Sequence, residues 1–132
     1  YTPAPLDVLT SAEKQKLPII QQAMRGVCND PGGTAKAYVY TRFPIAGKTG
    51  TAQTTGIAQN VKERQNEHSM DYFKRSHAWF TTYGPAENPQ FIVTVMVEHG
   101  GHGGEATGGI ISSIYNKLDD LGYIKKAPAA EQ

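Results

Sequence analysis

The stretch "HAWFTTYGPAENPQFIVTVMVEH", residues 77–99, contains the strongest strand signals in the chain. Its two ends, 77–84 and 91–99, are rich in β-branched and aromatic residues, which are enriched in strands. Glycine, proline and asparagine crowd the connector between them, and these residues favour turns. The stretch therefore predicts an antiparallel β-hairpin. Within it, Trp79 and Phe80 are expected to point to opposite faces of the sheet, one of them packed under a helix.

Two segments upstream of the hairpin carry weaker strand signals. Residues 35–43, "AKAYVYTRF", and residues 45–53, "IAGKTGTAQ", combine β-branched, aromatic and small residues on either side of Pro44. The polar run from 54 to 76 has no clear period and is highly charged in its middle. We expect strands in the first two segments and a mobile surface loop over 54–76.

Residues 6–30 are predicted to form a helix in two parts. Thr10 is followed three residues later by Glu13, which is the pattern of a capping box at a helix N-terminus. Pro18 is expected to limit the first part, because proline inside a helix removes a backbone hydrogen bond. The second part should bury one stripe of residues at helical spacing. That stripe consists of Leu17, Ile20, Met24 and Val27 or Cys28.

A final helix is marked by another apolar stripe at helical spacing. The stripe consists of Ile110, Ile114, Leu118 and Leu121. Gly122 suits the end of this helix, and residues 125–132 are expected to be a disordered tail. The order of these elements predicts an α+β fold in which helices flank an antiparallel sheet. Residues 1–124 are expected to form one structural unit.

Composition argues against several classes of function. The 132 residues have a formal net charge of +1, whereas nucleic-acid-binding proteins usually carry a basic stripe, so no nucleic-acid partner is expected. No apolar run approaches the roughly 20 residues that a membrane-spanning helix needs. Cys28 is the only cysteine, so an internal disulfide is impossible, and its thiol is expected to be a small buried hydrophobic group.

The triplet Gly47-Lys48-Thr49 matches the last part of a phosphate-binding loop, G-x-x-x-x-G-K-[ST]. The first glycine of that pattern should stand at position 42, which is Arg42, and Pro44 lacks a backbone N–H that a phosphate cradle would use. The residues after Thr49 are also poor helix formers, although the pattern requires a helix there. These failures weigh against a nucleotide-binding site.

The run Lys48-Thr49-Gly50-Thr51 has two other interpretations. It can be a plain polar strand, or it can be a strand edge that binds a carboxylate through one ammonium group and two hydroxyls. Successive side chains of a strand point to opposite faces, so Lys48 and Gly50 share one face and Thr49 and Thr51 share the other. A backbone N–H at this edge could also serve as an oxyanion donor. The triplet alone does not decide between these interpretations.

A family resemblance favours the second interpretation. "AGKTGTAQ" followed by "HAWFTTYGPAENPQFIVTVMVEHGGHGG" resembles the C-terminal part of the penicillin-binding transpeptidase domain, which has a serine β-lactamase-like fold. K-T-G belongs to the signature set of these serine acyl-transferases. The similarity is to the class B, elongation-type enzymes of the penicillin-binding protein 2 kind. It extends from about Leu17 to Ile124 and includes "MRGVCNDPGGTA" ahead of the lysine strand.

The resemblance implies a peptidoglycan D,D-transpeptidase. In such an enzyme a serine attacks the D-Ala-D-Ala carbonyl of a stem peptide and releases the last D-Ala. The acyl group then passes from the serine to an amine on a neighbouring stem, and β-lactams acylate the same serine. Lys48 matches the lysine that supports proton transfer, and Thr49 and Thr51 match the hydroxyls that hold the substrate carboxylate. Gly50 would let the substrate backbone lie close, and the N–H of Thr51 matches one oxyanion donor. No cofactor is implied.

The nucleophile of this family lies upstream of K-T-G, with an S-x-N motif between them. Ser11-Ala12-Glu13-Lys14 matches S-x-x-K, but it stands too close to Lys48, the chain has no S-x-N triplet, and Ser11 is well explained as part of a helix cap. We therefore expect the chain to be a piece of a transpeptidase domain that is inactive alone. Its last hydrophobic strand should need a partner, either the missing part of the domain or a second copy.

The implied partners are peptidoglycan stem peptides, β-lactams, the remainder of the same domain and membrane proteins of an elongation complex. The implied location is the periplasmic face of the bacterial inner membrane. A non-catalytic sensor or scaffold with the same fold is the alternative. A metal site is not expected: His99 and His102, with Glu98, have suggestive spacing but no well-placed third ligand, and the glycines around them suit a turn into a helix.

Overall fold

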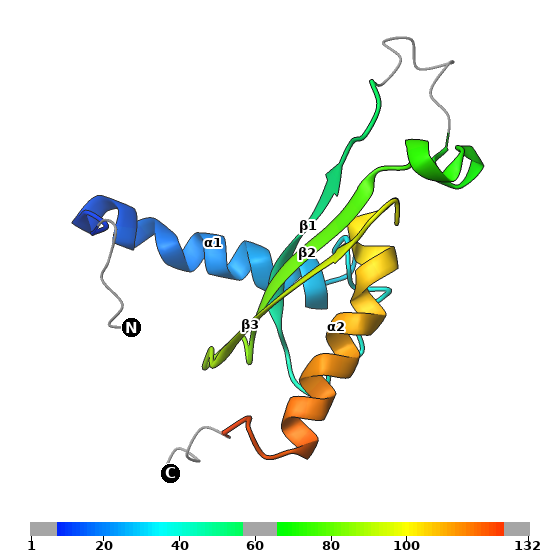
Figure 1. Ribbon diagram of the computed structural model, residues 1–132. Helices are drawn as coiled ribbons and strands as arrows, with labels where there is room; N and C mark the ends of the chain where they lie inside the picture. The colour runs from blue at the N-terminus through cyan, green and yellow to red at the C-terminus, as the bar shows by residue number, and fades with distance from the viewer. Residues whose placement is uncertain (1–7, 57–65, 126–132) are drawn as a thin grey trace.

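A computed structural model describes residues 8–56 and 66–125 (Figure 1). It contains a three-stranded antiparallel sheet in the order β1-β2-β3, with two helices and two short 3-10 helices. The elements are α1 (Ser11–Asn29), β1 (Ala46–Ala52), η2 (Glu67–Ser69), η3 (Tyr72–Lys74), β2 (His77–Gly84), β3 (Phe91–Val97) and α2 (Gly103–Asp120). The predicted α+β class and its antiparallel sheet are confirmed.

The predicted hairpin is formed by β2 and β3, which pair in antiparallel register. Thr81 lies opposite Thr94, and their hydroxyl oxygens are 3.1 Å apart. Gln90 closes the connector by donating its backbone N–H to the carbonyl of Gly84 at 3.1 Å. β3 pairs only with β2 in the described sheet, so the prediction that its outer edge needs a partner stays open to test.

Helix α1 begins as predicted but does not break at Pro18. The Thr10 hydroxyl accepts from the N–H of Glu13, and the Glu13 carboxylate accepts from the N–H of Thr10, which forms the capping box. The predicted division into two parts is wrong, because the helix runs without interruption through Pro18. Residues 11–23 are exposed, so water can hydrate the carbonyl that proline leaves without its helical partner.

The predicted buried stripe of α1 holds only near its C-terminal end. Leu17 and Ile20 are 37% and 52% exposed, whereas Cys28 is buried. Figure 1 shows the reason: α1 leans against the sheet only through its last turns, and its first half projects away from it. There Asn29 donates its side-chain amide to the carbonyl of Ile45 at 2.7 Å and fixes the helix to the start of β1.

The strand predicted over 35–43 is wrong. The carbonyl of Ala35 accepts from the N–H groups of Tyr38 and Val39, at 2.9 and 3.1 Å, so the chain makes a tight helical turn. Ala35 and Val39, four residues apart, are both buried in the core. A spacing of four fits a turn of this kind. The β-branched and aromatic residues of the segment favour a strand instead, in which side chains alternate with a period of two.

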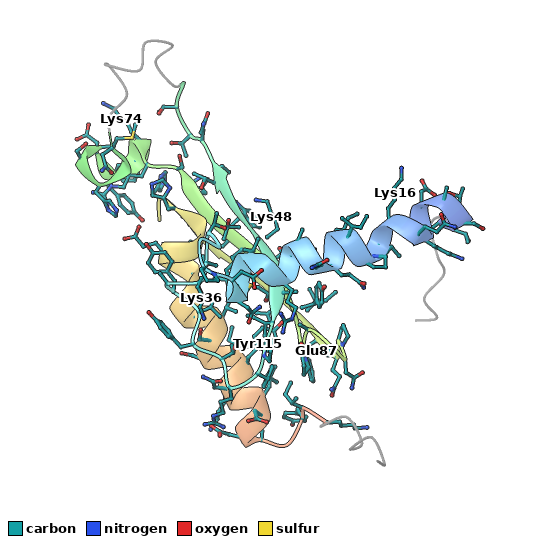
Figure 2. All side chains as sticks on the ribbon, turned by 180° about the vertical axis from the view of Figure 1, so that it is seen from behind. Lys16, Lys36, Lys48, Lys74, Glu87 and Tyr115 are labelled. Carbon is teal, nitrogen blue, oxygen red and sulfur yellow. The ribbon has the colours of Figure 1, made fainter. Side chains whose placement is uncertain are left out.

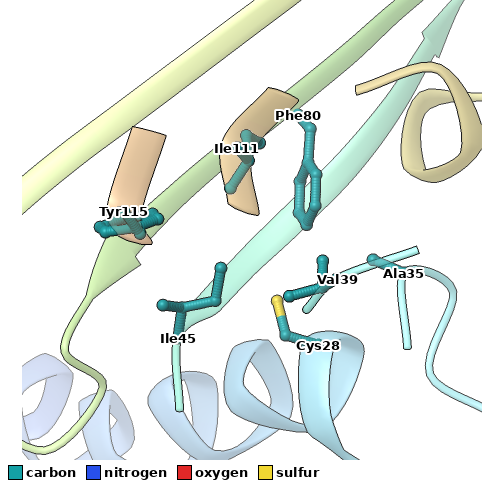
Figure 3. Close-up of a cluster of buried hydrophobic side chains, with 7 residues drawn as sticks. All are labelled: Cys28, Ala35, Val39, Ile45, Phe80, Ile111 and Tyr115. Atoms are coloured by element: carbon teal, nitrogen blue, oxygen red, sulfur yellow. The ribbon is translucent and has the colours of Figure 1, made fainter. Parts of the chain in front are cut away.

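The hydrophobic core lies between the sheet, α2 and the last turn of α1 (Figure 3). It is a single cluster of buried side chains from these elements and the turn before β1. Its members are Cys28, Ala35, Val39, Ile45, Phe80, Ile111 and Tyr115. Phe80 is fully buried in this core, whereas Trp79 on the opposite face of β2 is 41% exposed. The predicted placement of these two rings is confirmed.

The stripe predicted for α2 is only partly correct: Leu118 packs against the core and Ile114 is half-buried, but the fully buried face is centred on other residues. Ile111 is fully buried and Ile110 is 44% exposed, and the predicted Leu121 is also exposed. Small residues cause the shift, because Gly104 and Gly108 lie against backbone where a side chain would not fit. A Cβ on Gly108 would stand 2.6 Å from the carbonyl oxygen of Tyr38. A stripe defined by large aliphatic residues alone misses this contact.

The predicted end of α2 is confirmed. Gly122 has a positive φ of 74° and donates its N–H to the carbonyl of Asp119. Tyr123 donates to the carbonyl of Leu118 at 3.0 Å, which completes a glycine-terminated helix end. Within the described residues no helix is long and apolar enough to span a membrane.

The predicted loop over 54–76 is described only at its two ends. Residues 57–65 lie outside the described residues, as do residues 126–132 of the predicted tail. The second of the two described ends, 66–76, contains η2 and η3. The mobility of the loop and of the tail stays a prediction.

Cys28 is expected to react slowly with thiol reagents in the folded protein. Burial raises the pKa of its thiol to about 11, and the thiolate is the reactive form, so little of it exists at pH 8. Titration with a disulfide reagent at pH 8 should label Cys28 at least about tenfold more slowly in native buffer than in denaturant. Equal rates in the two conditions would show that the thiol is accessible and that the core around it is open.

Candidate active site

Strand β1 places the four residues of the K-T-G-T run on both faces of the sheet. Lys48 pairs with Thr81 and Gly50 with Trp79, so these residues share one face. Thr49 and Thr51 pair with Phe80 and Ala78 respectively, which places both threonines on the face that carries the core. The alternation expected from the sequence is present, and no single face collects all four side chains.

Lys48 is exposed, and its position is shown in Figure 2. Its Nζ donates a hydrogen bond to the carbonyl oxygen of Thr49 at 2.7 Å. The backbone continues as a strand through Thr49 to Ala52, so a phosphate loop followed by a helix is not formed here. The ammonium group of Lys48 is therefore a surface charge that an anionic ligand can approach.

Thr49 and Thr51 line a cavity of about 340 Å³ between β1, the turn at Thr34 and the start of α2. The hydroxyl oxygens of Thr34 and Thr49 lie 3.1 Å apart. The remaining lining residues are Tyr38, His102, Gly103, Gly104 and Glu105. Thr34, Thr49 and Thr51 thus line the same cavity beside β1.

Thr34 was missed as a candidate site residue by sequence reasoning. Its "GGTA" context carried part of the family resemblance, but nothing in its spacing to Thr49 indicated that the two hydroxyls meet. The turn that follows, which replaces the predicted strand over 35–43, brings them together. Thr34 therefore joins Thr49 and Thr51 as a possible donor to a bound carboxylate.

The start of α2 lies directly on the sheet beside Gly50. A Cβ on Gly103 would stand 2.5 Å from the carbonyl oxygen of Gly50 and 2.4 Å from that of Trp79, so only glycine permits this approach. His102 is the N-cap residue and makes no side-chain hydrogen bond to the helix. The positive end of the helix dipole therefore points toward the cavity, which favours a negative group there.

The other candidates from the sequence lie elsewhere. Ser11 is the first residue of α1. Lys16 lies in the same half of that helix, and Figure 2 shows that this half is far from Lys48. His99 uses its ring in hydrogen bonding, with Nδ1 at 3.0 Å from the carbonyl oxygen of Arg75. In residues 8–56 and 66–125 no group of three or more histidine, cysteine or acidic side chains is placed to hold a metal ion.

Comparison with known families matches residues 7–118 to the transpeptidase domain of penicillin-binding proteins. Curated relatives include the peptidoglycan D,D-transpeptidase MrdA of Haemophilus influenzae, 38% identical over 84 residues, and MrdA of Escherichia coli K12, 36% identical over 101 residues. The matched segments are 63% and 76% of this chain, but they span only 13% and 16% of those relatives.

Solved structures give the same result. The penicillin-binding protein PBP2 of Helicobacter pylori, in a complex with MreC, is 39% identical with a TM-score of 0.74, over 88% of this chain and 19% of that one. PBP2 of Pseudomonas aeruginosa, in complex with WCK 5153, is 27% identical with a TM-score of 0.70, over 99% of this chain and 26% of that one. The chain thus belongs to the penicillin-binding protein transpeptidase family, as part of a transpeptidase domain of the PBP2 kind.

Proposed function

We propose that this chain forms one wall of the active site of a peptidoglycan D,D-transpeptidase that works through a serine acyl-enzyme and is acylated by β-lactams. The observation that carries the proposal is the arrangement on β1. Thr49 and Thr51 line a cavity on one face of the sheet, and the exposed Lys48, the residue before Thr49, carries a positive charge on the other face. A cation and hydroxyl donors suit the terminal carboxylate of a stem peptide. Penicillins also carry a carboxylate, so the same groups suit them.

Each residue has a separate role in this proposal. The hydroxyls of Thr49 and Thr51 hold the carboxylate of the donor peptide, and Lys48 adds positive potential and supports proton transfer. The backbone N–H of Thr51 stabilises the developing oxyanion, a contribution whose loss in other enzymes costs about 10²- to 10³-fold in rate. The nucleophilic serine and the S-x-N motif come from a part of the protein outside this chain, so the 132 residues alone are inactive.

Partners and location follow from the same proposal. The substrates are peptidoglycan stem peptides, which places the site at the periplasmic face of the inner membrane, where the cell wall is built. The PBP2 of Helicobacter pylori was solved in a complex with MreC, which supports a membrane-associated elongation partner for the protein that contains this chain. The remainder of the transpeptidase domain is a further obligatory partner.

Labelling with a fluorescent penicillin tests the proposal. We expect the full-length protein to form a covalent adduct that survives denaturing electrophoresis, and the isolated 132-residue chain to form none. A full-length protein without an adduct would instead support a non-catalytic sensor or scaffold.

A further inference from the structure

His99, in the turn between β3 and α2, has an uncommon backbone conformation with a positive φ of 53°. Asparagine, aspartate and histidine enter this left-handed region more often than other non-glycine residues do, yet it remains unfavourable. A residue kept in this conformation has surroundings that hold it there.

Both the backbone and the ring of His99 bond to the entrance of β2. Its backbone N–H donates to Nδ1 of His77 at 2.9 Å, and its own Nδ1 lies 3.0 Å from the carbonyl oxygen of Arg75. A carbonyl oxygen can only accept, so Nδ1 of His99 carries a hydrogen and donates it. The ring of His77 thus accepts a hydrogen bond at Nδ1, whereas the ring of His99 donates one at the same atom.

Aromatic packing encloses the same ring. The centroid of the His99 ring lies 5.0 Å from that of Tyr72, 5.7 Å from that of Phe73 and 4.6 Å from that of His77. Tyr72 and Phe73 belong to η3 and are largely exposed, and the rings of both lie against that of His99. The short helix η3 is thereby attached to the turn after β3.

The segment from 66 to 76 that His99 holds is also connected to the end of β1. The hydroxyl of Thr54 donates to the carbonyl oxygens of Lys74 and Arg75, at 2.9 and 3.1 Å. Thr54 stands three residues after Thr51, and Ala78 at the start of β2 pairs directly with Thr51. A shift of residues 66–76 would therefore also move the Thr51 end of β1, which lines the cavity.

The same segment is connected to the start of α2, the other side of that cavity. Gly101 donates its N–H to the carbonyl of Ser76 at 2.9 Å, and Nε2 of His68 lies 3.4 Å from a carboxylate oxygen of Glu105. Glu105 is in the first turn of α2 and lines the cavity with Thr49 and Thr51. His99 stands between these two attachments.

We propose that His99 is a positioning residue, which clamps residues 66–76 between the Thr51 end of β1 and the start of α2 and so fixes the width of the cavity. The clamp itself follows from the contacts above. Its effect on the binding of a carboxylate rests on the proposed function, so the two parts are tested by separate measurements.

Limited proteolysis of the full-length protein tests the clamp without any activity. Lys74 and Arg75 are trypsin sites inside the held segment, and Lys36 is an exposed site outside it. His99→Gly removes the ring and keeps a residue that accepts a positive φ, and it should raise cleavage after Lys74 and Arg75 roughly tenfold, with cleavage after Lys36 unchanged. His99→Asn accepts the same backbone and can donate to the Arg75 carbonyl but lacks the ring, so its cleavage should be slower than that of His99→Gly and faster than that of the wild type.

Acylation kinetics test the positioning role. The concentration dependence of penicillin acylation separates the dissociation constant of the initial complex from the rate of the covalent step. For His99→Gly we expect the dissociation constant to rise about tenfold, with less than about a threefold change in the covalent step, and His99→Asn should recover most of the affinity. A purely structural defect would instead reduce the fraction of active protein and leave both constants unchanged.

The outcomes separate the two proposals. Unchanged tryptic cleavage in His99→Gly, or equal cleavage of the glycine and asparagine variants, overturns the clamp. Faster cleavage with an unchanged dissociation constant overturns the positioning role. A wild-type protein that penicillin does not label refutes the proposed function, and proteolysis still decides the clamp. If His99→Gly does not fold, His77→Ala, which removes the acceptor for the His99 N–H and the ring that packs against His99, replaces it in both measurements.

Discussion

Lys48→Ala in the full-length protein is expected to lower the second-order rate constant of penicillin acylation by about 10²-fold or more. The ammonium group is exposed on β1, and the neighbouring threonines that would hold the substrate carboxylate lie on the opposite face of the same strand. Its removal takes away a positive charge at the site of an anionic substrate and a group that would assist proton transfer. A time course of labelling with fluorescent penicillin, followed by denaturing electrophoresis, measures the effect.

Lys16→Ala is the matched control for this experiment. Lys16 is also an exposed lysine, but it lies in the half of α1 that projects away from the sheet, at a distance from Lys48 (Figure 2). Both variants remove one charge, so a general effect of net charge would appear in both. The control should be labelled at the wild-type rate. Near-normal labelling of Lys48→Ala would refute the assigned role of this lysine.

Ile111→Ala is expected to destabilise the folded protein by about 2–5 kcal/mol, the usual range for an isoleucine in a packed core. The side chain of Ile111 is fully buried on α2 and belongs to the same cluster as Phe80 and Tyr115. Deleting three carbon atoms there removes buried apolar area and leaves a cavity. Urea unfolding of the full-length protein, followed by tryptophan fluorescence, measures the loss in the free energy of unfolding.

Ile110→Ala is the matched control, because it makes the same substitution one position earlier on the same helix. Ile110 is 44% exposed, and we expect its loss to cost less than about 1 kcal/mol. The pair also separates two descriptions of α2, since the sequence pattern alone places Ile110 in the buried stripe. A larger loss for Ile110→Ala than for Ile111→Ala would contradict the packing described above.

Local patterns predicted the hairpin, the start of α1 and the end of α2 correctly. The strands of β2 and β3 have strong intrinsic preferences and a turn-rich connector, and the capping box of Thr10 and Glu13 needs only neighbouring residues. The end of α2 is also a local feature, because the left-handed backbone of Gly122 depends only on the last turn of the helix. In these cases the physical cause and the sequence signal lie within a few residues of each other.

The predictions that failed depend on contacts between distant segments. The exposed first half of α1 follows from where the helix meets the sheet, and the buried face of α2 follows from glycines that lie against other backbone segments. For the site, the alternation of Lys48 and Thr49 was predictable, because it needs only the strand period. The approach of Thr34 to Thr49, fifteen residues later, was not predictable, because it depends on a turn whose residues resemble a strand.

A crystal structure of the full-length protein acylated by a penicillin tests the central claim most directly. We predict that the β-lactam carboxylate lies within hydrogen-bonding distance, about 2.5–3.0 Å, of the hydroxyl of Thr49 or Thr51. The covalent bond should join the drug to a serine outside these 132 residues, and Lys48 should face the bound drug. A drug attached to Ser11, or a carboxylate bound away from β1, would contradict the account.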